Sequence, residues 1–252
     1  MSTVSYLIVQ DYHINKETRY ATMGHLLVFN PTNKDANLKV TFYYEDEEPT
    51  ETYLTAKALR TNEWNWDNLS NLKKYKRFAM QVISSEPVVT QATIGWNNKL
   101  NDYSSYARNG ERETAMSYLG ITQLSKIWYY ADGIVIDSTD MWVRESEWNI
   151  ILNPADKPAK VMMTLFFRDG SIQNLEYTIQ ARRISWIYMD DVVTKRNILY
   201  GTRIKSTEPI VVQHLRVVYW IGKKEDAYWT DVPVMAFWSV PFSPSPLTWA
   251  EE

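Results

Sequence analysis

The chain has 252 residues, 45% of them hydrophobic, and a formal net charge of −3. This composition is typical of a soluble globular protein with one large or two ordinary domains. The longest apolar runs, such as 186–189 and 209–212, are far shorter than the roughly 20 residues that span a bilayer. The acidic balance disfavours nucleic acid as a partner, and the absence of cysteine excludes disulfides. We expect no membrane insertion and, because no signal peptide is recognisable, a cytoplasmic location.

The first half of the chain predicts a series of short β-strands. Runs rich in β-branched and aromatic residues alternate with clusters of Pro, Asn, Asp and Gly, as in strands joined by turns. An Asn-Pro pair at 30–31 is expected to end a strand, because proline cannot donate to the ladder. The segment 112–120 is compatible with either a short helix or a strand. The predicted strand runs cover residues 25–31, 38–46, 51–59 and 78–96.

The second half repeats this organisation. A second Asn-Pro pair stands at 153–154, and Arg-Asp-Gly at 168–170 predicts a tight hairpin. Strands spaced by about ten residues, with little helical periodicity, are typical of a β-sandwich or jelly roll. The runs cover residues 148–154, 160–170, 174–189 and 200–220.

The two halves align as an internal duplication. Asn30 falls on Asn153 at an offset of 153 − 30 = 123, and further matches follow in order downstream. The segment EPVVTQ at 86–91 falls on EPIVVQ at 208–213, at an offset of 122. An ordered series of this kind indicates tandem copies of one domain. We predict two β-sandwich or jelly-roll-like domains, residues 1–121 and residues 122–252.

The second copy also resembles a known family. Its positions follow, in order, the pattern of the sensory-rhodopsin transducer family: Trp128, Asp132, Gly133, Glu145, Asn153, Arg183, Gln213, His214 and Arg216. The resemblance covers nearly all of 126–230 and, more weakly, 5–120. It implies a compact β-sandwich close to jelly rolls and carbohydrate-binding modules, assembly into symmetric homo-oligomers, and a signalling partnership of the kind described for microbial rhodopsins.

The closing strand of the second copy is the best candidate for a site. His214 and Arg216 share one face of that strand, and Gln213 points to the other. The first copy has Ala92 and Ile94 at the corresponding positions, so the fold does not require this His and Arg. An arginine fork and nearby carboxylates would suit a carboxylate or sugar hydroxyls, with tryptophan as a stacking wall. The predicted ligand-binding residues are Trp128, Asp132, Glu145, Arg183, His214 and Arg216.

An alternative remains open for these residues. The arginines and glutamates could pair with one another to hold strands together, and the tryptophans could belong to the core. The three histidines have no metal-ligand spacing, and neither a Gly-rich phosphate loop nor a G-x-S-x-G turn is present. We therefore predict no metal, no cofactor and no catalytic residue. The basic stretch 73–77 and the acidic stretch 45–49 are interpreted as solvated loops.

Two functions are compatible with these sequence features. The first is a non-enzymatic ligand-binding or signalling module that works as an oligomer, with a small-molecule or sugar ligand or a protein signalling partner. The tandem copies would form a built-in pseudo-dimer. The alternative is a carbohydrate-active enzyme, in which His214, Arg216 and nearby carboxylates cleave an acidic sugar by acid/base catalysis.

Overall fold

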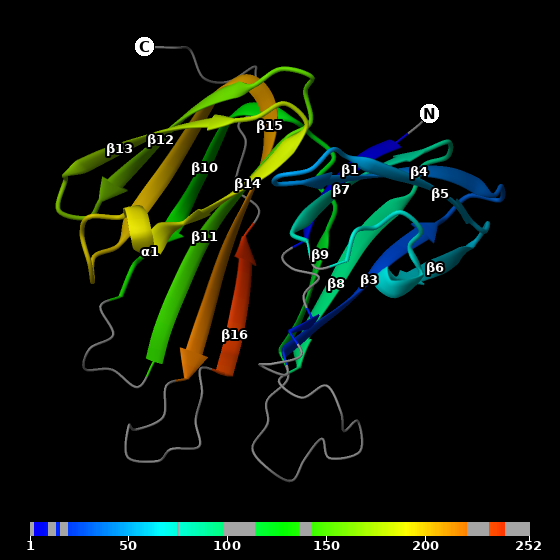
Figure 1. Ribbon diagram of the computed structural model, residues 1–252, viewed down its shortest axis with the longest axis horizontal. Helices are drawn as coiled ribbons and strands as arrows, with labels where there is room; N and C mark the ends of the chain where they lie inside the picture. The colour runs from blue at the N-terminus through cyan, green and yellow to red at the C-terminus, as the bar shows by residue number, and fades with distance from the viewer. Residues whose placement is uncertain are drawn as a thin grey trace, which may run out of the picture. The chain divides into compact units, whose positions relative to one another are not determined.

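The structure is a computed structural model that describes residues 3–9, 14–15, 20–74, 76–97, 114–136, 143–220 and 232–239. The chain divides into two compact units, Met1–Gln123 with Val232–Ala236, and Leu124–Asp231 with Phe237–Glu252. Both are built almost entirely of antiparallel strands (Figure 1). The all-β prediction is therefore confirmed, while the predicted boundary between residues 121 and 122 stays a prediction.

The first unit has two antiparallel sheets. One sheet has the strand order β1-β7-β4-β5, and the other has the order β2-β3-β8-β9, with β6 also pairing with β3. The segment 112–120, for which both a helix and a strand were compatible with the sequence, contains strand β9. The elements are β1 (Thr3–Val9), β2 (Ile14–Asn15), β3 (Tyr20–Asn30), β4 (Ala36–Tyr44), β5 (Thr50–Ala56), β6 (Arg60–Asn65), a 3-10 helix η1 (Trp66–Asn68), β7 (Phe78–Ser84), β8 (Val89–Asn97) and β9 (Thr114–Leu119).

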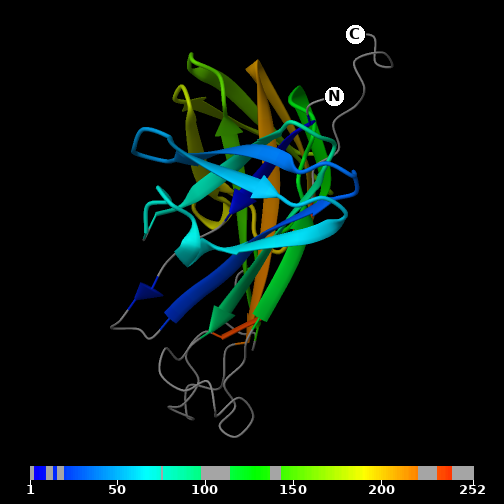
Figure 2. The same cartoon turned by 90° about the vertical axis from the view of Figure 1, so that its right-hand side faces the viewer.

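The second unit repeats this order with one long strand in place of two. Residues 200–206 of β15 pair with β10 and β12, and residues 211–220 pair with β11. The strand, orange in Figures 1 and 2, runs through both layers of this unit. The elements of the chain from residue 125 onwards are β10 (Ser125–Gly133), β11 (Val143–Asn153), β12 (Ala159–Phe167), β13 (Ile172–Ile179), β14 (Arg183–Tyr188), α1 (Met189–Val192), β15 (Tyr200–Trp220) and β16 (Val232–Ser239).

Strand registers confirm the duplication at the level of single residue pairs. Leu26 faces Ala92 between β3 and β8, and Asn149 faces His214 between β11 and β15. These two pairs are separated by 149 − 26 = 123 and 214 − 92 = 122 residues, the offsets found in the sequence. The same correspondence holds between β4–β7 and β12–β15, so the copies share one topology and one register.

Buried asparagines explain the repeated Asn-Pro pairs. Asn30 and Asn153 are the last residues of β3 and β11 and are fully buried. The Asn30 side-chain amide donates to the Lys34 and Ala56 carbonyls, and Asn153 makes the equivalent bonds to Lys157 and to Ile179. A buried amide needs such partners, so this asparagine fixes the turn after the strand in each copy.

The predicted hairpin at 168–170 is also present. The Gly170 N–H donates to the Phe167 carbonyl at 2.9 Å, and Gly170 has a φ of 84°. A positive φ costs glycine little, which accounts for its place in this turn. Alternate residues of β12 face the core, with Val161, Met163 and Leu165 at most 2% exposed. No helix in the part of the chain that the structure describes is long and apolar enough to cross a membrane.

Candidate functional site

Two of the predicted site residues form an ion pair at the surface of the second unit. The Arg216 Nη1 atom donates to Asp132 Oδ1 at 3.0 Å, joining β15 to the end of β10. The Asp132 side chain is 65% exposed and that of Arg216 is 18% exposed. The pair is accessible to a partner, and its Coulomb energy is reduced by solvent on the Asp132 side.

The other predicted residues lie in different surroundings. Trp128 is 2% exposed, and its indole N–H donates to the Ser125 carbonyl at 3.1 Å, so its ring belongs to the core. Arg183 opens β14 opposite Asn153. Because His214 faces Asn149, Arg183 lies about 13 Å further along the sheet, at 3.3 Å per residue. Glu145 lies in β11 opposite Val218, and its side chain lies outside the described part of the chain.

His214 lies beside Glu147, a residue that is not among the predicted ligand-binding residues. The Glu147 Oε1 atom lies 2.9 Å from His214 Nε2, and these side chains are 1% and 2% exposed. At this distance, and closed off from solvent, the imidazole and the carboxylate form a buried ion-pair contact. Glu147 Oε1 also accepts from the Tyr200 hydroxyl at 2.9 Å, and Oε2 accepts from the Ile134 N–H at 3.0 Å. The Glu147 carboxylate therefore accepts two hydrogen bonds in addition to its contact with His214.

Two further side chains complete this buried cluster. The Tyr130 ring stacks on His214, with centroids 4.4 Å apart and planes 14° apart. The Asn149 amide donates to the Tyr130 hydroxyl at 2.7 Å. Burial, and next the negative charge of Glu147, raise the pKa of both Tyr130 and Tyr200 far above the ordinary tyrosine value. We call Tyr130, Glu147, Asn149, Tyr200 and His214 the buried polar cluster.

The buried polar cluster adjoins the surface ion pair. Glu147 faces Arg216 in the register of β11 and β15. Ile134, whose N–H binds Glu147, follows Asp132 by two residues. On the other side, the Glu147 N–H donates to Asp190 Oδ2 of α1 at 3.1 Å. A change at Asp132 can therefore reach Glu147 through the backbone of residues 132–134. A change at Arg216 can reach it through the pairing of β11 with β15.

The first copy has an apolar core at the same place. Register puts Gly24 at the Glu147 position, and Leu26 and Ala92 at the Asn149 and His214 positions. A Cβ atom on Gly24 would lie 2.1 Å from the Trp66 ring, which is 1% exposed. The indole thus occupies the space next to strand β3 where the second copy has a carboxylate. At the described positions of the first copy that match it, the polar cluster has no counterpart.

Glu147 and Asn149 were not among the predicted site residues, but the sequence contains a pattern that indicates them. Glu147 and Asn149 occupy alternate positions in a strand, so they share one face, and they align with Gly24 and Leu26. Two polar residues at core-facing positions, replaced by small or apolar residues in the other copy, indicate a buried polar group. Tyr130 and Tyr200 gave no such signal, because tyrosine suits both a core and a surface.

The charged loops of the first copy neutralise one another. Lys73 and Lys76 both pair with Glu47, the Lys76 contact at 2.8 Å, and Lys76 also pairs with Asp46. Arg77 lies 3.9 Å from Glu45. The acidic stretch 45–49 and the basic stretch 73–77 therefore form one surface network and not a basic patch. In the described residues no group of three or more His, Asp or Glu side chains could hold a metal ion.

These features define a class of protein: a tandem β-sandwich in which the second copy has a buried polar cluster next to a surface ion pair, and the described first-copy positions that match Glu147, Asn149 and His214 are Gly24, Leu26 and Ala92. The model of the Anabaena sensory rhodopsin transducer family matches residues 7–99 and 124–232, one match in each copy. The matches cover most of the chain, and the protein belongs to this family.

Solved structures similar to this chain include a Thermotoga maritima protein described as 1070, with 19% identity and a TM-score of 0.39 over 47% of this chain and 93% of that protein. Another is the Anabaena sensory rhodopsin transducer itself, with 26% identity and a TM-score of 0.29 over 35% of this chain and 92% of that protein. No curated protein matches the chain.

Proposed function

We propose that this protein is a non-catalytic signalling or adaptor module whose second copy binds the partner. The observation that carries this proposal is the Asp132–Arg216 ion pair, which has an exposed Asp132 and a partly buried Arg216 and adjoins the buried polar cluster. An arginine with a planar fork beside an acidic group suits recognition of a charged partner. The first copy has the buried Ile94 at the Arg216 position and cannot make this contact.

The burial of the acid/base groups favours binding over catalysis. His214 and Glu147 are at most 2% exposed, and the Tyr130 ring covers the imidazole. A general acid or base must come within hydrogen-bond reach of its substrate, and these side chains face the core. We assign Asp132 and Arg216 to partner contact, and His214 and Glu147 to positioning of β11, β15 and the segment after β10. Trp128 supports the same strands from the core.

The family description supports a protein as the partner, because it names a transducer of a sensory rhodopsin. We include in the proposal a cytoplasmic location and assembly into a homo-oligomer. Within one chain, two copies with the same topology would supply part of the symmetry of the oligomer. The second copy, which has the buried polar cluster, would recognise the signalling partner.

A charge-swap series tests this proposal. Proximity labelling in the native organism would identify the partner, which is then purified for titration against Asp132→Arg, Arg216→Asp and the double variant. Both single variants are expected to lose partner affinity. The double variant restores the ion pair, and therefore the fold, but presents reversed charges and is expected not to bind. Recovery of full affinity in the double variant would show that the pair is only structural.

A second measurement addresses the enzymatic alternative. The wild-type protein is incubated with neutral and acidic oligosaccharides, and the mixtures are analysed for shortened products by mass spectrometry. We expect no product. Turnover that disappears in His214→Ala, with the fold intact, would establish the carbohydrate-active enzyme instead.

A further inference from the structure

One end of the first unit has a group of exposed apolar side chains. Leu59 lies in the turn between β5 and β6 and is 69% exposed. Phe29, near the end of β3, faces Val89 at the start of β8, and these residues are 45% and 49% exposed. Phe29 also faces Thr61 of β6, which follows Leu59 by two residues, so the three apolar residues belong to neighbouring segments. We call Leu59, Phe29 and Val89 the apolar tip.

Leu59 has a backbone conformation that bulky residues rarely adopt. Its φ is 53°, in the left-handed region that suits glycine and asparagine. The Leu59 N–H donates to the Thr32 carbonyl at 3.0 Å, which fixes the turn. A mostly exposed side chain gains little core packing to offset the backbone strain. A leucine retained in such a place therefore indicates a contact made outside the chain.

The second copy has the same turn without an apolar tip. Arg182 stands at the Leu59 position, at the offset 182 − 59 = 123, and has a φ of 54°. Leu152 and Val211 occupy the other two positions of the tip and are fully buried. The left-handed turn is therefore common to both copies, whereas the exposed apolar side chains belong to the first.

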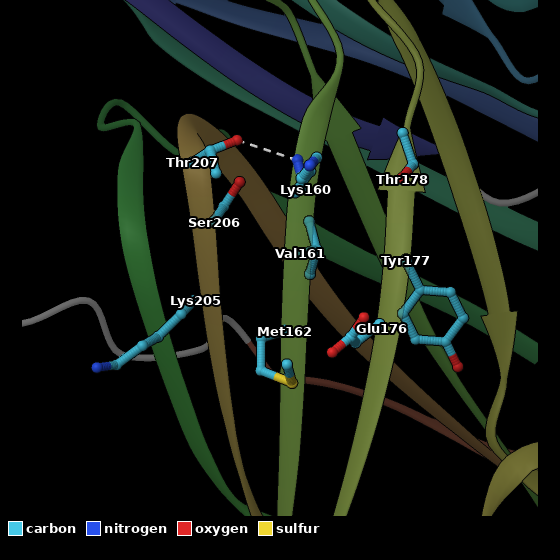
Figure 3. A pocket seen from close by; sticks show the side chains of 9 residues that line it. All are labelled: Lys160, Val161, Met162, Glu176, Tyr177, Thr178, Lys205, Ser206 and Thr207. Carbon is cyan, nitrogen blue, oxygen red and sulfur yellow. Dashed lines mark hydrogen bonds between the residues drawn. The ribbon is translucent and has the colours of Figure 1, made fainter.

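The strands next to this end are joined in the same way in both copies. In the second copy the Lys160 N–H donates to the Thr207 hydroxyl at 3.0 Å, beside the hollow that residues of β12, β13 and β15 line (Figure 3). In the first copy the Asn37 N–H donates to the Ser85 hydroxyl at 2.9 Å. The backbone at this end is thus equivalent, and the side chains make the difference.

Basic side chains surround the apolar tip. Lys34 and Arg60 are exposed, and neither forms an ion pair within the part of the chain that the structure describes. Lys57 pairs with Asp35 at 2.8 Å, so these two charges cancel. Glu86, in the segment before β8, is the remaining carboxylate at this end. The unpaired charges are therefore two cations and one carboxylate, a positive balance.

We infer that the apolar tip docks the first unit on the surface of an anionic lipid bilayer. Apolar side chains rimmed by cations match the layers of such a surface, in which phosphates lie above acyl chains. Leu59, Phe29 and Val89 enter the boundary between headgroups and acyl chains, and the long side chains of Lys34 and Arg60 reach the phosphates. Docking of this kind is peripheral and needs no spanning segment. It goes beyond the proposed signalling function, which rests on the second copy.

Sedimentation with lipid vesicles tests this inference on the intact chain. We expect binding to vesicles of equal parts phosphatidylcholine and phosphatidylglycerol, and about fivefold weaker binding to pure phosphatidylcholine. Leu59→Asn removes the apolar side chain and places asparagine in a conformation that it adopts readily. This variant should be at least as stable as the wild type and should lose about tenfold in vesicle affinity. Arg182→Asn makes the matched change in the second copy and should bind like the wild type.

Two charge variants change the affinity in opposite directions. Lys34→Gln should weaken binding to the anionic vesicles about fivefold, and Glu86→Gln should strengthen it by a similar factor. Both effects should shrink with added salt and vanish on neutral vesicles, because they arise from attraction to lipid phosphate.

A fluorescent label locates the contact independently of affinity. The chain has no cysteine, so Leu59→Cys and Arg182→Cys each accept a single environment-sensitive dye. A blue shift on anionic vesicles is expected for the dye at position 59 and not for the dye at position 182.

The inference is overturned if no vesicles bind, if neutral and anionic vesicles bind equally, or if Leu59→Asn binds as the wild type does. Binding of a partner protein that depends on Leu59, without vesicle binding, would also overturn it and assign the tip to a protein interface. The vesicle experiment contains no partner protein, so its failure is separate from failure of the Asp132–Arg216 proposal.

Discussion

The Glu147 carboxylate lies 2.9 Å from the imidazole Nε2 of His214, with both side chains almost completely removed from solvent. Two charged or strongly polar groups in such a place are stable only when each supports the other. The Tyr200 hydroxyl and the Ile134 N–H satisfy the carboxylate further. The packing of β11 against β15 therefore depends on these polar contacts.

Removing one member of the pair is expected to destabilise the second unit strongly. His214→Ala or Glu147→Ala leaves the other group buried without its partner, at a cost of about 3–5 kcal/mol. Hydrogen–deuterium exchange of the β11 and β15 amides measures this loss locally, because exchange reports the free energy of opening in each element. The amides of β3 and β8 in the first unit are the internal reference and should keep their protection.

The double variant His214→Ala/Glu147→Ala separates a specific interaction from simple loss of packing. If the two groups stabilise each other, the double variant loses less than the sum of the single losses, because neither member of the pair is left buried without the other. Strictly additive losses would contradict mutual stabilisation of the pair. The exposed Lys57–Asp35 pair of the first unit provides a control, and Lys57→Ala should leave exchange in β11 and β15 unchanged.

In the first copy, stability depends on the absence of a side chain at residue 24. A Cβ on Gly24 would overlap the buried Trp66 ring, whose shape cannot change and whose position is fixed by Phe78 at 5.4 Å. Gly24→Ala should therefore destabilise the first unit by about 1–3 kcal/mol, as overpacking does. Gly201→Ala is the matched control, because its Cβ would meet nothing nearer than 3.6 Å. Equal thermal stability of the two variants would be contrary to this expectation.

The strands, the turns and the duplication could be predicted because they depend on local patterns. Alternation of residues such as Val161, Met163 and Leu165 reports a strand with one buried face. The Asn-Pro pairs and Gly170 report turns through backbone chemistry. The run predicted at 200–220 coincides with β15, which spans these 21 residues although Pro209 cannot donate to the ladder.

The site was only partly predictable for a related reason. His214 and Arg216 could be chosen by comparing the copies, but their partners depend on which strands become neighbours. Asp132 meets Arg216, and Glu147 meets His214, only because β10 and β11 flank different ends of β15.

The loop network of the first copy predicts a specific acid sensitivity. Lys73 and then Lys76 lower the pKa of Glu47 to about 2 through side-chain hydrogen bonds. Because the folded pKa is below the ordinary value of 4.5, the contribution of Glu47 is present above about pH 4.5 and is lost as the pH falls towards 2. The difference in thermal midpoint between wild type and Glu47→Gln should therefore shrink over this range. It should also shrink at neutral pH in 1 M salt, since the network is exposed. A difference independent of pH would count against the network.

The contribution of Tyr200 to stability has the opposite pH dependence: it is lost at alkaline pH. Burial, and then the negative charge of Glu147, raise the pKa of this phenol far above its ordinary value of 10, so the folded state keeps the hydroxyl protonated. Its contribution to stability is fully present below about pH 10 and is lost as the pH rises further, because the unfolded chain then releases the proton. Tyr200→Phe removes the bond to Glu147 and should be less stable than wild type at pH 8, by about 1–3 kcal/mol. Urea unfolding between about pH 8 and 11 should show this difference narrowing above pH 10. A gap that stays constant or widens would mean that Tyr200 ionises in the folded protein and that the buried polar cluster is open to water.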